Sequence, residues 1–220
     1  MPATTYAQLV GTAAGVLLLS AVLVVWRRSL IAAVRLLALQ GVALAVLVAV
    51  MALHAGEGAL LLVAVLVLVL KAVVLPGAVR RAMQLAAGER EEAPLLNPTA
   101  ALLACVALAG LAYVVSAPLV EIGDDPALRV VPVGVSLVLI GLLTIASRRR
   151  AMSQLIGFVM MDNGIATVAL LTAGGVPLVV ELGVSLDVLL VVLILAVLTT
   201  RMRSVFGDTD LDELRELREE

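Results

Sequence analysis

Residues 148–174 read RRRAMSQLIGFVMMDNGIATVALLTAG, and this stretch decides how the rest of the chain is interpreted. Three arginines end abruptly at an apolar run that is long enough to cross a bilayer, which takes about 20 helical residues. Near the middle of the run a carboxylate, Asp162, lies beside an amide, Asn163. Because a charge in hydrocarbon is costly, Asp162 indicates either a proton or ion relay or a protonated or amide-paired group that holds helices together.

The composition is that of an integral membrane protein. Of the 220 residues 63% are hydrophobic, and the mean hydropathy is +1.18, whereas soluble domains contain about 45–50% apolar residues. Most segments are continuous apolar runs of about 20 residues, which is typical of membrane helices and not of the alternating strands of membrane barrels. We therefore expect an all-α, polytopic fold.

Seven transmembrane helices are expected in a single membrane domain, residues 1–220. Residues 82–98 are predicted to be the longest connection, either a short interfacial helix or a tether, and the acidic tail to be either a frayed segment or an amphipathic helix docked on a neighbouring subunit. We group the helices as a first three-helix unit (6–81), a linking helix (99–120) and a second three-helix unit with the tail (130–217). The predicted spans are 6–26, 31–53, 58–79, 99–120, 130–147, 151–173 and 182–202.

The distribution of arginine predicts the orientation in the membrane. Positively charged residues accumulate in the cytoplasmic loops of membrane proteins. The loops after the second, fourth and sixth spans contain only Arg129, whereas the first, third, fifth and seventh spans are followed by arginines at 27, 28, 35, 80, 81, 90, 148, 149, 150, 201, 203, 215 and 218. This bias predicts an external N-terminus and a cytoplasmic C-terminus, which requires an odd number of spans.

Lys71 lies within the third predicted span, about 13 Å along the helix before Arg80. It either snorkels toward the cytoplasmic surface or stays buried as a proton carrier or charge partner. Pro76 removes a backbone donor, so we expect it to free the carbonyl of Ala72 and to kink the helix beside the lysine.

Other polar residues extend the set of candidates. Asp187 lies five residues into the seventh span and Glu181 near its outer boundary, where the two would form the outward leg of a path, although an ordinary interface charge also fits Glu181 and Glu57. Gln40 and Asn163 are uncharged and would otherwise join helices by hydrogen bonds. The candidates for a proton or ion path are Asp162, Lys71, Asp187, Glu181, Glu57, Gln40 and Asn163.

Other chemistries lack their sequence signatures. The chain contains no phosphate-binding loop, serine elbow, dinucleotide fingerprint or Cys/His metal cluster, and no basic patch with interleaved aromatics that would bind nucleic acid. The single cysteine, Cys105, is expected to be a small buried side chain, and the single histidine, His54, a solvated loop residue. We expect no catalysis by this chain alone, and no metal or cofactor bound to it.

Three segments resemble the hydrogenase-4 component E family: SRRRAMSQLIGFVMMDNG (147–164), VELGVSLDVLLVVLILAVLTTRM (180–202) and the acidic DTDLDELREL (208–217). Asp162 stands where that family has a glutamate. More distantly, residues 130–217 resemble the K subunit of complex I and the C subunit of multisubunit sodium/proton antiporters. Relative to the complex I subunit, the carboxylates are shifted by about one helical turn, because its two glutamates would fall at Val159 and near Leu190.

The resemblance implies a membrane-arm subunit of a formate-hydrogenlyase-type group 4 NiFe hydrogenase complex in a bacterial or archaeal plasma membrane. Antiporter-like membrane subunits and a soluble hydrogenase-like module would be its partners, and those partners would hold the NiFe and iron–sulfur clusters. Asp162 would then be the central carrier of a proton or ion path. Two alternatives stay open: a scaffold that anchors neighbouring subunits, and a subunit of a cation/proton antiporter without a redox module.

Overall fold

The computed structural model describes residues 1–27, 29–85, 96–121, 123, 125–148 and 151–172. Every regular element within them is a helix, which confirms the all-α fold for this part of the chain. Six helices are long and apolar enough to span a membrane, and they match the first six predicted ranges: Ala3–Trp26, Leu30–Ala55, Gly58–Met83, Pro98–Val120, Leu128–Ser147 and Met152–Thr172. The seventh predicted span and the acidic tail lie outside the described residues.

Local sequence sets the helix ends. Ser29 caps α2 (Leu30–Ala55), where its hydroxyl accepts a hydrogen bond from a first-turn N–H at 3.4 Å. The same helix ends at Gly56, whose φ of 72° lies in the left-handed region that favours glycine. Asn97 caps α5 (Pro98–Val120) by accepting from a backbone N–H at 2.6 Å, and Pro98 follows it in the first turn.

The third membrane helix is longer and less regular than predicted. It consists of α3 (Gly58–Val67), a π-helical segment η1 (Leu68–Val74) and α4 (Leu75–Leu85), which follow one another without a break. The predicted connection therefore begins later than residue 82, because the sequence AMQL consists of good helix formers and contains no stop signal.

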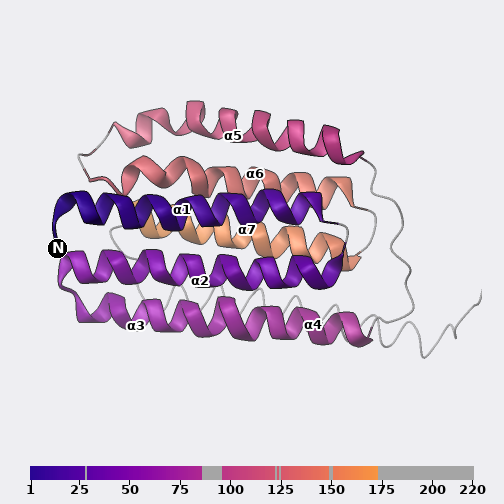
Figure 1. Cartoon of the computed structure of the whole chain (residues 1–220), viewed down its shortest axis with the longest axis horizontal. Helices are drawn as coiled ribbons and strands as arrows, with labels where there is room; N and C mark the ends of the chain where they lie inside the picture. The colour runs from indigo at the N-terminus through magenta and orange to yellow at the C-terminus, as the bar shows by residue number, and fades with distance from the viewer. Residues whose placement is uncertain (28, 86–95, 122, 124, 149–150, 173–220) are drawn as a thin grey trace, which may run out of the picture.

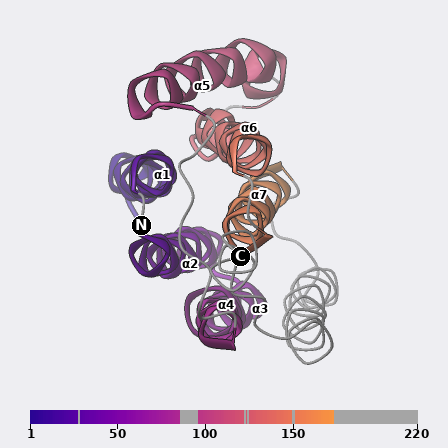
Figure 2. The ribbon, with the colours of Figure 1, turned by 90° about the vertical axis from the view of Figure 1, so that its right-hand side faces the viewer.

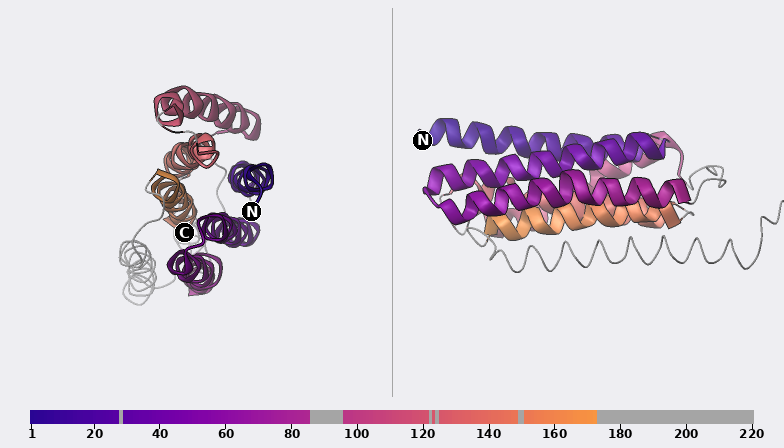
Figure 3. Two further views of the ribbon diagram at one scale, coloured as in Figure 1. Left: turned by 90° about the vertical axis from the view of Figure 1, so that its left-hand side faces the viewer. Right: turned by 90° about the horizontal axis from the view of Figure 1, so that it is seen from below.

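The helices run up and down along one common direction (Figure 1). Seen along that direction, α1 (Ala3–Trp26) and α2 face α6 (Val131–Ser147) and α7 (Ala151–Thr172), and these four form the centre (Figure 2). The other two long helices lie outside it: α5 packs against α6, and α3–η1–α4 packs against α2 (Figures 2 and 3). A single 3₁₀ turn, η2 (Leu128–Val130), leads into α6.

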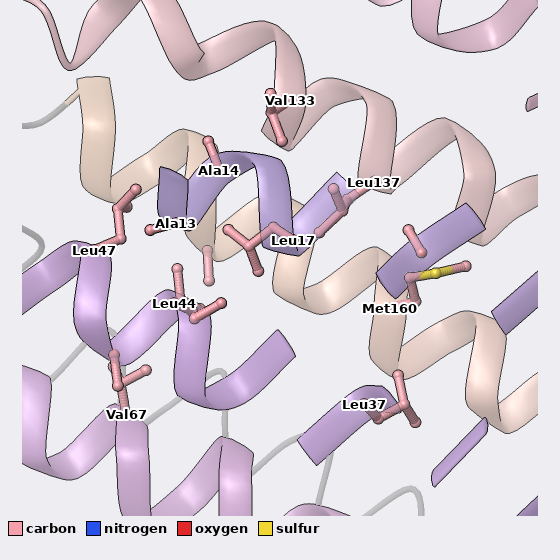
Figure 4. Close-up of a cluster of buried hydrophobic side chains, with 14 of the residues drawn as sticks. Ala13, Ala14, Leu17, Leu37, Leu44, Leu47, Val67, Val133, Leu137 and Met160 are labelled. Carbon is pink, nitrogen blue, oxygen red and sulfur yellow. The ribbon is translucent and has the colours of Figure 1, made fainter. Parts of the chain in front are cut away.

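Apolar side chains fill the centre and also cover the outside. Figure 4 shows Leu17, Leu44, Leu137 and Met160 meeting between the four central helices, where all four are buried. Outward-facing side chains are just as apolar; Val114 of α5, for example, is 73% exposed. An apolar exterior is what the hydrocarbon of a bilayer requires, and it agrees with a multi-pass membrane protein.

Four glycines bring α6 and α7 into backbone contact. A Cβ at Gly164 would lie 2.7 Å from the carbonyl oxygen of Gly134, and a Cβ at Gly157 would lie 2.9 Å from that of Gly141. The two glycines of each helix are seven residues apart, which places them on the same face. Gly157 and Gly164 therefore permit close approach of α7 to α6.

The described arginines near the helix ends, apart from Arg129 before α6, gather at one end of the bundle. Arg27 caps the C-terminus of α1, Arg35 lies in the second turn of α2, and Arg80 lies near the end of α4. Arg148, which caps α6, donates to the carbonyl oxygens of Val25 at 3.4 Å and Arg27 at 3.3 Å. A cation at these carbonyls offsets the negative end of the α1 dipole and ties the end of α6 to α1.

The glycine contacts give a first test. Replacing Gly157→Ala places a methyl group against the α6 backbone, so we expect the free energy of unfolding to fall by about 1–3 kcal/mol, as overpacking usually costs. The measurement is denaturation of the purified chain in detergent, followed by far-UV circular dichroism. Gly110→Ala in α5 is the matched control, since its methyl group meets nothing within 4 Å and helix propensity alone should raise stability by up to about 1 kcal/mol. Equal stability of the two variants would contradict the proposed contact.

Candidate functional site

A buried ion pair joins the π segment to α7. The ammonium nitrogen of Lys71 lies 2.5 Å from Oδ2 of Asp162, and the two side chains are only 1% and 4% exposed. Each residue lies near the midpoint of its membrane helix, Gly58–Met83 or Met152–Thr172. The snorkelling interpretation of Lys71 is therefore wrong, because its side chain points into the bundle and toward a carboxylate.

A buried amide pair lies next to the ion pair. Asn163 Nδ2 donates to Gln40 Oε1 of α2 at 3.1 Å, and both residues are at most 1% exposed. Because Asn163 follows Asp162 directly, one turn of α7 reaches both α2 and η1. The structure thus brings together four of the predicted path residues: Gln40, Lys71, Asp162 and Asn163.

The amide pair leaves one donor and one acceptor without a partner. Gln40 Nε2 and Asn163 Oδ1 are buried and have no hydrogen-bond partner among the residues that the structure describes. A buried, unsatisfied amide group costs about 1–3 kcal/mol. The two spare groups are the kind of donor and acceptor that a buried water molecule requires. Asn163 is held in place by the next turn, because the Thr167 hydroxyl donates to its carbonyl oxygen at 2.7 Å.

Opposite faces of α7 make different kinds of contact: one packs against the α6 backbone, and the other forms the polar contacts. Gly157 and Gly164 face α6 at backbone contact, whereas Asp162 and Asn163 face η1 and α2. Close packing on the glycine face fixes the position of α7 along its axis and its rotation about that axis. The polar side chains of the other face are therefore held at a fixed depth and direction. The carboxylate is therefore positioned by α6 although α6 does not bind it.

Lys71 is the one buried side chain of a segment that otherwise faces outward. Within η1, Leu68, Val69 and Val73 are 40%, 46% and 64% exposed, while Lys71 is 2% exposed. The arrangement is the reverse of a soluble surface helix, where lysine faces solvent. π-Helical turns are rare and often occur at functional sites, and this one carries the charge.

The π register also changes which carbonyl Pro76 leaves without a donor. The N–H of Leu75 donates to the carbonyl oxygen of Leu70, five residues earlier. In the same register, the residue at position 76 would donate its N–H to the carbonyl oxygen of Lys71, five residues earlier. Because proline has no N–H, the carbonyl left without a donor is that of Lys71 and not, as predicted, that of Ala72. In place of the kink that was predicted from Pro76, the helix contains a π segment just before the proline, with Lys71 at its centre.

Gly41 allows α2 to touch the backbone of Lys71. A Cβ at Gly41 would collide with the carbonyl carbon and oxygen of Lys71, and it would lie 2.6 Å from the nitrogen of Ala72. Only glycine fits this contact without moving η1. Gly41 is not among the residues predicted from the sequence, although its position directly after Gln40 is a signal that could have indicated it.

The remaining predicted site residues do not reach the pair. Glu57 is exposed at the N-cap of α3, at the opposite end from the gathered arginines. His54 lies in the last turn of α2, exposed, and its ring stacks on buried Tyr6 with centroids 4.0 Å apart, so it is a helix residue and not a loop residue. Asp187 and Glu181 lie outside the described residues. Cys105 is buried, as predicted.

Among the described residues, Lys71 and Asp162 are the only buried charged side chains. No group of three or more His, Cys, Asp or Glu that could hold a metal ion occurs in the same part of the chain. Two buried side chains of opposite charge in hydrogen-bond contact offer proton exchange and charge pairing.

The fold and site define a polytopic, helical membrane protein in which, among the described residues, a buried ion pair joins the central helix α7 to η1. The chain belongs to the family of the uncharacterized protein Rv0085 of Mycobacterium tuberculosis, to which it is 46% identical over 220 residues, the full length of both chains. It is also 32% identical to hydrogenase-4 component E of Escherichia coli K12 and of Shigella flexneri over 80 residues, 36% of this chain and 37% of theirs. No family model and no solved structure matches the chain.

The ion pair predicts a double-mutant cycle. Lys71→Met leaves the Asp162 carboxylate buried without its partner, so we expect the free energy of unfolding in detergent to fall by about 3–5 kcal/mol. The double variant Lys71→Met/Asp162→Asn removes both charges and should return to within about 1 kcal/mol of the unmodified chain. The coupling between the two sites is read from the four denaturation curves. Additive losses would show that the two charges do not depend on each other.

Proposed function

We propose that the chain is a membrane subunit of a hydrogenase-type complex and that the Lys71–Asp162 pair is part of its proton path. The buried pair carries this proposal, and the partial similarity to hydrogenase-4 component E supports it. Intramembrane ionisable residues are expensive, and in membrane proteins they mark proton relays and ion pathways. The described residues offer no metal cluster as an alternative use for the carboxylate.

The pair is suited to moving a proton because two of its states have the same net charge. The lysine can be protonated opposite a carboxylate, or it can be neutral opposite a carboxylic acid, and the two states differ by one proton moved across a single hydrogen bond. Such a transfer avoids the cost of placing a lone charge in a dry interior. The spare donor of Gln40 and acceptor of Asn163 would hold water next to the pair.

The remaining candidates extend the path in this proposal. Glu57 would serve one end, and Asp187 with Glu181 would form the outward leg. Antiporter-like membrane subunits and a soluble hydrogenase-like module would be the partners, with the NiFe and iron–sulfur clusters in them. This chain would supply the route for protons, and its partners would supply the redox chemistry.

The double variant separates transport from assembly. In membranes of a host that carries the complex, we expect Lys71→Met/Asp162→Asn to assemble normally on native gels, because no unpaired charge remains. Redox-driven proton uptake into inverted vesicles, measured with a pH-sensitive dye, should fall to the level of vesicles treated with an uncoupler. Ser116→Ala, at a buried hydroxyl of α5 away from the pair, should leave uptake unchanged.

Three outcomes would contradict the proposal. Normal proton uptake by the assembled double variant would show that the pair only joins helices. Loss of the complex from native gels, with normal uptake per assembled complex, would support the scaffold interpretation. Uptake that depends on sodium and needs no redox substrate would instead support a cation/proton antiporter.

We also propose seven spans with an external N-terminus and a cytoplasmic C-terminus. The gathering of Arg27, Arg35, Arg80 and Arg148 at one end of the described bundle supports this orientation.

Cysteine labelling in intact cells tests the orientation. In a Cys105→Ala background, Glu57→Cys should react with a membrane-impermeant maleimide, because Glu57 lies at the external end. Ser29→Cys, exposed at the arginine end, should react only after the membrane is permeabilised. The reverse labelling pattern would show that the chain is inserted the other way.

A further inference from the structure

A pocket of about 260 Å³ lies between α2 and the η1–α4 segment, at the arginine end of the bundle. Its lining includes Arg35 from α2, Arg80 from α4, and Ala72, Pro76 and Gly77 from the part of η1–α4 that precedes Arg80. The pocket has no part in the proposed proton path, although it reaches as far as the residue that follows Lys71.

Two arginines form the polar end of the pocket. Arg35 lies five residues after the start of α2 and Arg80 five residues before the end of α4, so both are about 7.5 Å from their helix ends and at a similar depth. Both are exposed, and neither forms an ion pair or hydrogen bond with a described residue. Among the described residues, no acidic side chain lines the pocket. An anion is therefore the ligand that fits this end.

The rest of the pocket is apolar and opens outward. From Arg80 to Ala72 the wall runs about 12 Å along the helix, toward the centre of the membrane. Ile31 and Val73 line the pocket and are 55% and 64% exposed, so it opens on the outer surface of the bundle. Gly77 leaves space at the wall, since a Cβ there would meet nothing within 4 Å.

We propose that this pocket binds an anionic phospholipid, whose phosphate pairs with Arg35 and Arg80 and whose acyl chain lies along Val73 and Gly77. Basic pockets between membrane helices at the headgroup level bind lipids of this class. A free phosphate ion would use the arginines but not the apolar wall. An anionic phospholipid fits both ends of the pocket, because it has a charged phosphate for the arginines and an acyl chain for the apolar wall.

The test uses the full chain purified in a neutral detergent and titrated with dioleoyl phosphatidylglycerol, with bound lipid counted by native mass spectrometry. Arg35→Gln/Arg80→Gln should weaken binding by roughly 25-fold, on the basis of about fivefold for each arginine. Arg81→Gln is the matched control: it removes the same charge one residue away from a lining arginine and should have little effect. Dioleoyl phosphatidylcholine, without net charge, should bind the unmodified chain no better than it binds the double variant.

A second variant tests the apolar wall without altering charge. Gly77→Leu fills the pocket and should abolish binding of phosphatidylglycerol while circular dichroism stays unchanged. Unaltered binding by Gly77→Leu, or an equal loss in Arg81→Gln, would overturn the proposal, because the lipid would then be held by general charge at the surface. Displacement of the bound lipid by millimolar inorganic phosphate would also overturn it and would assign the arginines to a free anion.

Discussion

The ion pair between Lys71 and Asp162 constrains how η1 packs against the central helix α7. Either charge alone in a dry interior costs several kcal/mol, so η1 and α7 must remain in contact at this depth. Asn163 extends the same turn to Gln40 of α2. Because lipid tails are as apolar as leucine, helices in a bilayer gain little from burying leucine. Two neighbouring polar contacts therefore set the relative depth of three helices.

Backbone contact makes these polar contacts possible. Gly157 and Gly164 let α7 lie against α6, and Gly41 lets α2 lie against the peptide group of Lys71. Glycine normally weakens a helix by about 0.5–1 kcal/mol relative to alanine. In this bundle the loss is offset by closer packing, which holds short side chains such as Asp162 within reach of their partners.

The sequence predicted where each described membrane helix lies along the chain, but it did not predict which helices contact one another. Apolar run length can be read along the sequence alone, and so six predicted spans match helices of the structure. Lys71 and Asp162 fall near the midpoints of their helices, as was expected of Asp162. The pairing of Lys71 with Asp162 depends on helix rotation, which a nearly uniform apolar pattern does not encode. Gly41 and the π register escaped prediction for the same reason, because each is defined by a neighbouring helix.

Because of the π segment, the direction of the Lys71 side chain depends on the number of residues before it as well as on the residue type. A turn closed by bonds five residues apart holds one residue more than an α turn, and each residue of an α-helix advances by about 100°. If one residue were deleted between Gly58 and Lys71, a regular α-helix could form, and the lysine would turn away from α7 unless α3 turned instead. In a comparison of relatives, a one-residue gap in this stretch therefore bears on the ion pair as directly as replacement of Lys71 itself.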